Sequence, residues 1–149
     1  MGDMCIAGEI QAVPRVVVVG LASCFGCQLQ ITNAEAHLME VLGQTDLLYW
    51  QLASSEPMPA DYDVAIIEGA VSTQEAVETV RAVRGKASKI IAIGSCATTA
   101  GIPGMAQENL SSRSGEVYGS TPAACGEMLP PRPVSDFVSV DFEVRCCPI

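Results

Sequence analysis

Positive charge is scarce in this sequence. Its 149 residues include 8 Lys and Arg against 17 Asp and Glu, and the net charge is −9. A chain this acidic has no general attraction to a phosphate backbone, so we do not expect it to bind nucleic acid. Charged residues of either sign make up only 17% of the chain and apolar residues 49%. This balance indicates a globular protein with part of its surface reserved for other proteins.

Long apolar runs and targeting signals are also missing. No apolar stretch approaches the ~20 residues that a helix needs to cross a bilayer, so we expect no transmembrane segment. The first residues, MGDMCIAGEIQAVP, contain no basic region followed by a long apolar one, and no twin-arginine pair. We therefore expect a cytoplasmic protein, with residues 1–14 as a poorly ordered leader and residues 15–149 as one folded domain.

Cysteine, in contrast, is abundant, with seven in the chain. An odd number of cysteines without a secretion signal does not suit a disulfide framework. In a reducing compartment, such enrichment points to metal binding or redox chemistry instead.

Short apolar runs alternate with helical patterns along the chain. The run RVVVVG at residues 15–20 is typical of a parallel strand that is covered on both faces. Strands that alternate with helices predict an α/β fold, with an open, mostly parallel sheet and helices on both faces. Five strands with this connectivity predict the flavodoxin-like order 2-1-3-4-5. The expected elements are strands at 15–20, 46–52, 62–70, 89–96 and from Phe137 onward, a helix after the first strand, a second helix with a capping box from Ser72 to Glu75, and a long functional loop at 101–135.

Four cysteines follow the ends of three predicted strands. Cys24 and Cys27 come after the first strand, Cys96 ends the fourth and Cys147 ends the fifth. Because the carboxyl ends of parallel strands meet along one edge, the fold brings these thiols to the place where ligands bind. Four thiolates suit zinc or an iron–sulfur cluster. One close pair with two distant single cysteines favours a 4Fe–4S cluster, since structural zinc is normally held by two close pairs.

Each cysteine also has a simpler interpretation. A Cys-x-x-Cys motif alone is typical of a redox dithiol, although that role leaves Cys96 and Cys147 without a function. Cys5 in the leader and Cys125 in the long loop are interpreted as small hydrophobic residues, not ligands. Alternation along the last strand puts Cys146 in phase with apolar, core-facing residues, so we predict that its neighbour Cys147 is the ligand.

Four segments resemble the small, electron-transferring subunit of nickel–iron hydrogenases, in the cytoplasmic branch of sulfhydrogenase delta and viologen- or deazaflavin-reducing types. These segments are CFGCQ, YDVAIIEGAVST, AIGSCATTAGIP and the final CCPI, which follow the family's order through nearly the whole chain. The resemblance implies one proximal 4Fe–4S cluster held by Cys24, Cys27, Cys96 and Cys147. It also implies a large partner subunit with a nickel–iron centre, leaves room for further electron-transfer subunits, and places no catalytic residue in this chain.

The sequence departs from that family near its end, where Cys146 stands in place of the usual glycine. A related alternative is the corresponding subunit of respiratory complex I, although that relative has adjacent cysteines at its first ligand position. An FMN-binding flavodoxin-like module is the main rival from another class, and ASCFGCQ offers it a poor phosphate nest. Glu68 ends the third strand beside the expected cluster, where it is either held by loop amides or relays protons toward the partner.

Overall fold

The computed structural model describes residues 13–106, 108–119 and 127–148, so residues 1–12 of the predicted leader lie outside it, as do Cys5 and Cys125. The main sheet has five parallel strands in the order β2-β1-β3-β5-β7. This order confirms the predicted flavodoxin-like arrangement. The strands are β1 (Arg15–Gly20), β2 (Asp46–Trp50), β3 (Val64–Glu68), β5 (Lys89–Ile93) and β7 (Phe142–Val144).

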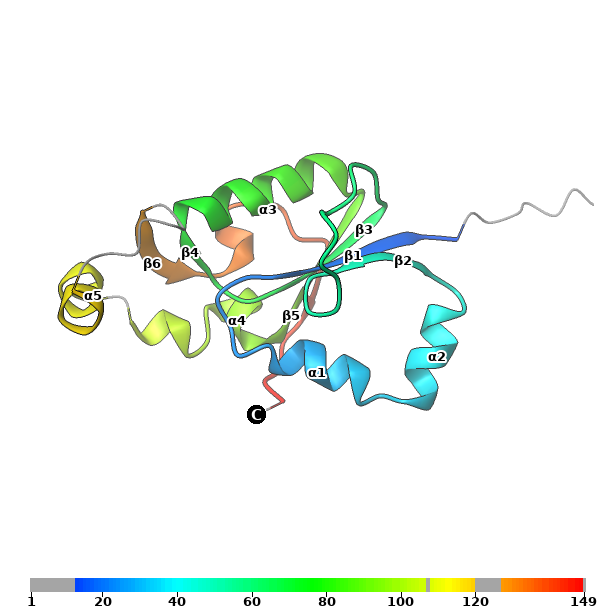
Figure 1. Cartoon of the computed structure of the whole chain (residues 1–149), viewed down its shortest axis with the longest axis horizontal. Coiled ribbons are helices and arrows are strands. Elements are labelled where there is room, and N and C mark those ends of the chain that lie inside the picture. The colour runs from blue at the N-terminus through cyan, green and yellow to red at the C-terminus, as the bar shows by residue number, and fades with distance from the viewer. Residues whose placement is uncertain (1–12, 107, 120–126, 149) are drawn as a thin grey trace, which may run out of the picture.

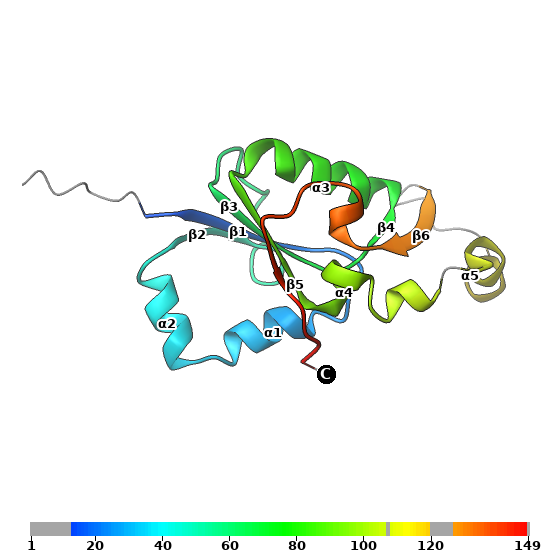
Figure 2. The same cartoon turned by 180° about the vertical axis from the view of Figure 1, so that it is seen from behind.

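Helices lie on both faces of this sheet, as Figure 1 and Figure 2 show from opposite sides. One long helix covers the upper face in Figure 1, and two short helices lie on the lower face. In the described ranges, no helix is long and apolar enough to cross a membrane. The helices are α1 (Gly26–Thr32) and α2 (Ala36–Leu42) below, α3 (Gln74–Lys86) above, and α4 (Gly94–Thr99), η1 (Pro103–Met105) and α5 (Leu110–Tyr118) after β5.

The hydrophobic core lies between the sheet and α3. Val77, Val80 and Val83 recur at helical spacing, and all three are buried. They pack in one cluster with alternate residues of the central strands, among them Ile67 and Ile90. Full burial of such side chains stabilises the fold by about 1.5–3 kcal/mol each. This half of the molecule is therefore the rigid platform from which the edge loops project.

The opposite face is covered less completely. α2 has no buried residue. An apolar cavity of about 320 Å³ lies between the two short helices and the central strands, with Ile66 and Ile91 in its wall. An apolar cleft of about 430 Å³ extends from there toward the chain end and shares Ile31 and Leu38 with the cavity. The α1–α2 side is thus loosely packed where it approaches the edge of the sheet.

Residues 101–135 contain regular structure in addition to loops. β4 (Val71–Thr73) pairs antiparallel with β6 (Met128–Arg132), and η3 (Val134–Asp136) follows. Pro130 and Pro131 argue against a central strand, but a two-stranded edge accommodates them. β4 includes Ser72, so α3 begins one residue later than predicted. Its N-cap is Thr73, whose side-chain oxygen accepts the Ala76 N–H at 3.1 Å. The predicted capping box is therefore wrong by one residue.

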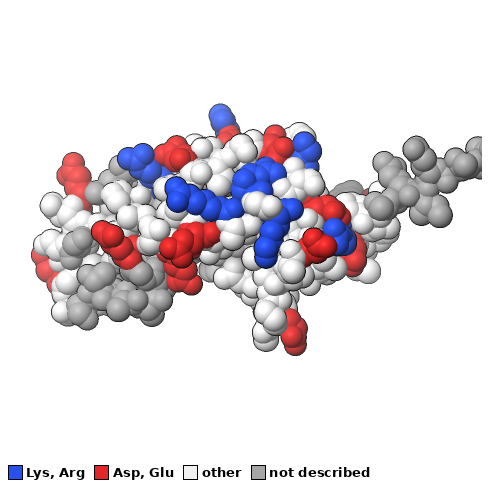
Figure 3. Space-filling model, turned by 90° about the horizontal axis from the view of Figure 1, so that it is seen from above, with Lys and Arg blue, Asp and Glu red and all other residues white. Residues whose placement is uncertain are grey.

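Charge is unevenly distributed over the molecule. Residues 16–80 include no Lys or Arg, whereas Arg81, Arg84, Lys86 and Lys89 follow closely in α3 and β5. Figure 3 looks onto the α3 side and shows basic side chains gathered there, with acidic ones around them. The α1–α2 side is built mainly from the segment without Lys or Arg, and its cleft and cavity are lined mostly by apolar residues.

Candidate metal centre

The turn after β1 carries the first two thiols. Phe25 starts this turn with a left-handed φ of 60°, and its carbonyl accepts the Leu29 N–H at 3.0 Å as α1 begins. Such a conformation costs a residue with a side chain about 1–3 kcal/mol, a strain typical of functional sites. The turn leaves Cys24 exposed and Cys27 partly buried in the first turn of the helix. Both thiols lie at the carboxyl end of β1, as the sequence predicted.

Cys96 lies in the first turn of α4 and not at the end of a strand. β5 ends at Ile93, so the predicted strand at 89–96 is three residues too long. Gly94, which starts the helix, has a φ of +82°, and a Cβ at this position would overlap the Sγ of Cys27. The glycine therefore lets the segment that carries Cys96 approach the segment that carries Cys27.

The end of the chain forms the third segment of the site. It passes the start of α4, where the Ser95 N–H donates to the Cys146 carbonyl at 2.8 Å, and Figure 2 shows it beside α4 and α1. Cys146 and Cys147 are both exposed, and Cys146 lines the apolar cleft together with Cys27. The predicted core-facing position of Cys146 is wrong, because Cys146 is exposed and Val144 on the same face is 50% exposed.

The thiols act on one another electrostatically. Burial raises the pKa of Cys27 to about 12, and negative charge on Cys146 and Cys96 adds to the effect. Burial also raises the pKa of Cys96, with added contributions from charge on Cys24 and Cys147. Cys146 therefore contributes to the raised pKa of Cys27, and Cys147 to that of Cys96. A bound cation would displace the thiol protons and offset this repulsion.

Glu68 lies beneath these thiols at the end of β3 and is 1% exposed. Its Oε1 accepts the backbone N–H of Cys27 at 3.1 Å, and its charge contributes to the raised pKa of both Cys27 and Cys96. Its Oε2 has no hydrogen-bond partner among the described residues. Glu68 is thus held by a backbone amide, as in the first predicted role, but this amide lies in the first turn of α1 and not in a loop.

The donor set fits a bulky thiolate-bound group. All five cysteines in the described ranges are free thiols. Within those ranges, no group of three or more His, Cys, Asp or Glu side chains is placed to hold a single metal ion. The thiols come from three segments at one sheet edge, and the missing Cβ of Gly94 lets the Cys27 Sγ lie against the segment that carries Cys96. Iron–sulfur clusters are held by cysteine thiolates, so the residues present fit such a group.

Comparison with known proteins identifies the family. Residues 24–149 match the family described as NADH ubiquinone oxidoreductase, 20 Kd subunit. The chain belongs to this family. The matched region starts at Cys24 and extends beyond Cys147, so it includes all the thiols of the candidate centre together with Glu68 and Gly94.

The curated relatives of this chain are longer than the chain itself. Sulfhydrogenase 2 subunit delta of Pyrococcus furiosus is 34% identical over 134 residues, which cover 90% of this chain and 56% of that protein. NAD-reducing hydrogenase HoxS subunit delta of Cupriavidus necator is 29% identical over 103 residues, which cover 69% of this chain and 49% of that protein. The chain thus spans about half the length of the curated relatives it matches.

Solved structures share the fold. A chain in the crystal structure of an NAD+-reducing NiFe-hydrogenase in the H2-reduced state superposes with a TM-score of 0.74 at 24% identity, over 87% of this chain and 80% of that one. A chain of the Ni-Fe-Se hydrogenase from Desulfomicrobium baculatum gives a TM-score of 0.61 at 18% identity, over 91% of this chain and 56% of that one. At these identities, the likeness establishes the α/β fold of the family member.

Gln28 is a residue of the centre that sequence reasoning missed. It is fully buried beside Cys27, and its Oε1 accepts the indole N–H of Trp50 at 2.7 Å. This bond ties α1 to the end of β2 and so fixes the helix turn that carries Cys27. The sequence indicates that Trp50, if buried, requires a hydrogen-bond acceptor for its indole N–H. It does not indicate that Gln28 is this acceptor.

Proposed function

We propose that this chain is the electron-transferring small subunit of a nickel–iron hydrogenase and holds one proximal 4Fe–4S cluster through Cys24, Cys27, Cys96 and Cys147. The observation that carries the proposal is the meeting of three separate segments, each with a thiol, at the carboxyl edge of one parallel sheet. Ligands of open α/β sheets bind at this edge. A cluster, being larger than one ion, suits ligands that arrive from several directions.

The chain's own residues would bind the cluster, orient its ligands and tune its reduction potential. When bound, the cluster supplies one-electron transfer at a potential set by its surroundings. The core under α3 fixes β1 and β5, whose carboxyl ends present Cys24, Cys27 and Cys96, and it fixes β3, which ends in Glu68. Glu68 holds the backbone amide of Cys27 in place and adds a negative charge beneath the site. Gly94 allows the close contact between two of the thiol-bearing segments.

The names of the curated relatives support a hydrogenase. Both relatives described above are named as hydrogenase delta subunits. In the proposed assembly, electrons pass to or from a nickel–iron centre in a large partner subunit, as hydrogen is oxidised or protons are reduced. Further electron-transfer subunits are compatible with this role. Because the thiols of the centre need a reducing compartment before they receive iron, we place the assembly in the cytoplasm.

A second candidate function follows from the family description, which names NADH ubiquinone oxidoreductase. In this alternative, the chain is the cluster-bearing subunit of a complex I-like oxidoreductase. The candidate ligands in this chain are the same for both functions, and the partner differs. Nickel in an associated large subunit therefore distinguishes the hydrogenase from the complex I-like assembly.

Purification with native partners in the absence of oxygen tests both candidates. We expect about four irons per chain, broad visible absorption, and nickel in a co-purifying large subunit. Iron without nickel would support the complex I-like alternative. Resolved flavin absorption bands would instead favour an FMN module, and a colourless protein that unfolds with a chelator would favour structural zinc. Either of these last two results would overturn the cluster assignment.

Glu68 is also a candidate proton relay toward the partner subunit. Beyond holding the Cys27 amide, its unpartnered and buried Oε2 gives it an oxygen that can accept a proton. We predict that this oxygen relays protons toward the partner. Glu68→Gln should then slow hydrogen oxidation by the complex while the iron content is retained. An unchanged rate of hydrogen oxidation would contradict this prediction.

A further inference from the structure

Five thiols surround the candidate centre, one more than a four-ligand cluster requires. The additional thiol belongs to Cys146, which lines the apolar cleft of about 430 Å³ together with Cys27. Its carbonyl accepts the Ser95 N–H at 2.8 Å. A Cβ on Gly94 would overlap the Cys27 Sγ and lie 3.7 Å from this same carbonyl oxygen. Cys146 is thus fixed at the junction of the three thiol-bearing segments.

The end of the chain can present either of its two thiols to the site. β7 ends at Val144, and residues 145–148 belong to no helix or strand. Cys146 and Cys147 are both exposed, so neither side chain is held by packing. Neighbouring residues in extended chain point to opposite sides. A rotation of the peptide unit between them therefore changes which thiol faces the sheet edge, and it requires the Cys146 carbonyl to release the Ser95 N–H.

We propose that Cys146 is an alternative ligand that takes the place of Cys147 at the fourth corner of the cluster. This inference rests on the proposed function. In the exchange, the iron–sulfur bond to Cys147 breaks and a bond to Cys146 forms, while the proton of the Cys146 thiol moves to the Cys147 sulfur. No electron is gained or lost in this step.

Tethering makes Cys146 an effective competitor. A thiol that is linked to the leaving ligand through one peptide unit is present at the iron at an effective concentration on the order of millimolar or higher. Cys24, by contrast, has no cysteine next to it in the sequence, and neither has Cys96. Among the four candidate ligands, Cys147 alone has a neighbouring cysteine in the sequence, and residues 145–148 belong to no helix or strand.

The test uses the full chain, purified with its partners without oxygen, in four variants. These are Cys147→Ala, Cys146→Ala, the double variant of both, and Cys24→Ala as the matched control for a ligand without a spare. Iron per chain and the electron paramagnetic resonance spectra of the oxidised and the reduced sample are measured. We expect each single variant at 146 and 147 to keep about four irons. The double variant and Cys24→Ala lose iron or convert to a three-iron signal.

Thiol alkylation provides a readout that does not depend on iron content. In the wild-type complex, iodoacetamide modifies Cys146 while Cys147 is protected. In the Cys147→Ala variant, Cys146 becomes protected because it now binds iron. A Cys147→Ala variant that keeps its iron while Cys146 stays reactive would overturn the inference, because another group would then be the fourth ligand.

The remaining outcomes separate this inference from the proposed function. If Cys147→Ala loses the cluster while Cys146→Ala keeps it, the inference is wrong and the proposed ligand set stands. If Cys146→Ala loses the cluster while Cys147→Ala keeps it, Cys146 is the sole ligand and interchange is again wrong. If the wild-type chain contains no iron, the proposed function itself fails. Circular dichroism of each variant identifies any loss that is due to unfolding.

Discussion

Gly94 lies where two thiol-bearing segments are in close contact. Its φ of +82° lies in the left-handed region, and an added Cβ would overlap the Cys27 Sγ. We expect Gly94→Ala to lower the free energy of unfolding by about 1–3 kcal/mol through backbone strain alone. The displaced thiol also costs the chain its iron, so metal analysis of the purified variant should show a loss greater than the loss of fold seen by circular dichroism.

Gly85 offers a matched control for this substitution. It lies within α3, and a Cβ on it would meet nothing within 4 Å. Because alanine is the better helix former, Gly85→Ala should leave iron content unchanged and stabilise the chain by up to about 1 kcal/mol. Equal iron loss in both variants would show that the close contact at Gly94 has no special role.

Glu68 is the second residue whose environment decides a measurable property. Its buried carboxylate accepts the Cys27 amide, and its negative charge is near the thiols. Negative charge disfavours the reduced cluster, which carries one more electron. Glu68→Gln keeps the hydrogen-bond acceptor and removes the negative charge, so the reduction potential of the cluster should rise. A rise of about 59 mV corresponds to a tenfold change in the one-electron equilibrium constant.

A redox titration followed by electron paramagnetic resonance measures this shift. Glu78→Gln is the control, since Glu78 is an exposed carboxylate on α3 and solvent screens its charge. An unchanged potential in Glu68→Gln, with the cluster intact, would contradict the predicted electrostatic effect of this residue on the cluster. A shift of the same size in Glu78→Gln would assign the effect to net charge.

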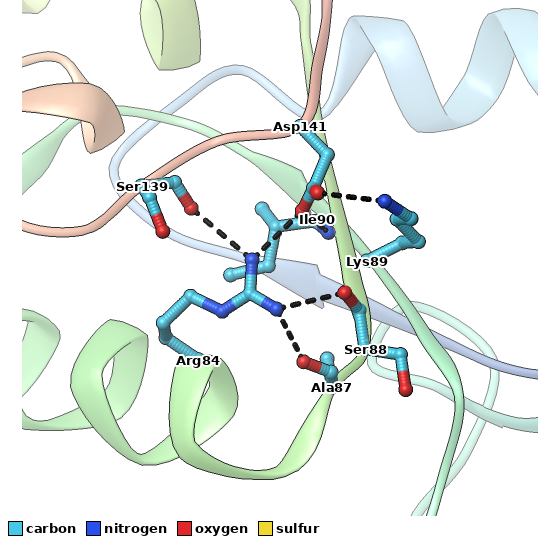
Figure 4. Close-up of polar contacts among 7 residues, drawn as sticks. All are labelled: Arg84, Ala87, Ser88, Lys89, Ile90, Ser139 and Asp141. Atoms are coloured by element: carbon cyan, nitrogen blue, oxygen red, sulfur yellow. Dashed lines mark hydrogen bonds and ion pairs between the residues drawn. The ribbon is translucent and has the colours of Figure 1, made fainter.

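Among the elements, β7 depends most on a single side chain. This strand of three residues pairs only with β5, and Asp141 precedes it. The Asp141 carboxylate accepts the Ile90 N–H at 2.8 Å and pairs with Arg84 at 2.7 Å and Lys89 at 3.1 Å, as Figure 4 shows. The Asp141 backbone N–H returns a bond to the Ile90 carbonyl at 3.0 Å. One carboxylate thus fixes the strand that delivers Cys147.

Asp141→Ala should release this strand and with it the fourth ligand. The Ile90 N–H loses its acceptor and two cations lose their counter-charge, so the free energy of unfolding falls and iron leaves faster on exposure to a chelator. Glu143→Ala is the control on the same strand, because Glu143 pairs only with Arg145 of its own segment in the described contacts. Equal iron release from both variants would contradict the role of Asp141.

The pH dependence of this contact follows from the pKa of Asp141. The Ile90 N–H, Arg84 and Lys89 hold this pKa far below the ordinary carboxyl value of about 3.9. A lowered pKa contributes stability that is complete above the ordinary value and is lost as the pH falls through the lowered one. We therefore expect hydrogen exchange at Ile90 to stay slow relative to the unfolded chain down to about pH 4.

The same elements show how far the sequence alone leads. Continuous apolar runs predict β1, β2, β3 and β5 to within a few residues, and the alternation with helices predicts their order, whereas the last strand covers only Phe142–Val144 and not the whole stretch from Phe137. The position of Cys96 in a helix was not predictable, since GSCATT has weak propensity and tertiary contacts determine where β5 ends. The pairing of β4 with β6 was not predictable either, because it joins distant segments and one of them contains adjacent prolines.

The candidate site was predictable to a similar degree. Topology brings Cys24, Cys27 and Cys96 to one edge, and this follows from the strand order alone. The environment of Cys146 was not predictable, because strand alternation says which face a residue occupies and not whether a helix covers that face. Val144 shows the difference, because it lies on the same face as Cys146 and is exposed.

At the scale of the whole molecule, the two faces of the sheet differ in how firmly they are held. α3 has 13 residues and buries three valines against the core. α1 and α2 have 7 residues each, and apolar spaces of about 320 and 430 Å³ remain beside them. Local stability follows the number of buried apolar contacts. The iron-free chain should therefore open first on the α1–α2 side while the α3 side stays closed.

Hydrogen exchange followed by mass spectrometry tests this difference. In the iron-free chain, we expect amides in α1 and α2 to exchange at least about tenfold faster than those in α3, a ratio that corresponds to about 1.4 kcal/mol of local stability. Iron loading should slow exchange in α1, because a ligand that binds only the closed state stabilises it and Cys27 lies in the first turn of that helix. α5 is the internal control, since it carries none of the candidate ligands and its exchange should not change. Uniform exchange across α1, α2 and α3 would show that the apolar spaces beside the short helices do not weaken that side of the sheet.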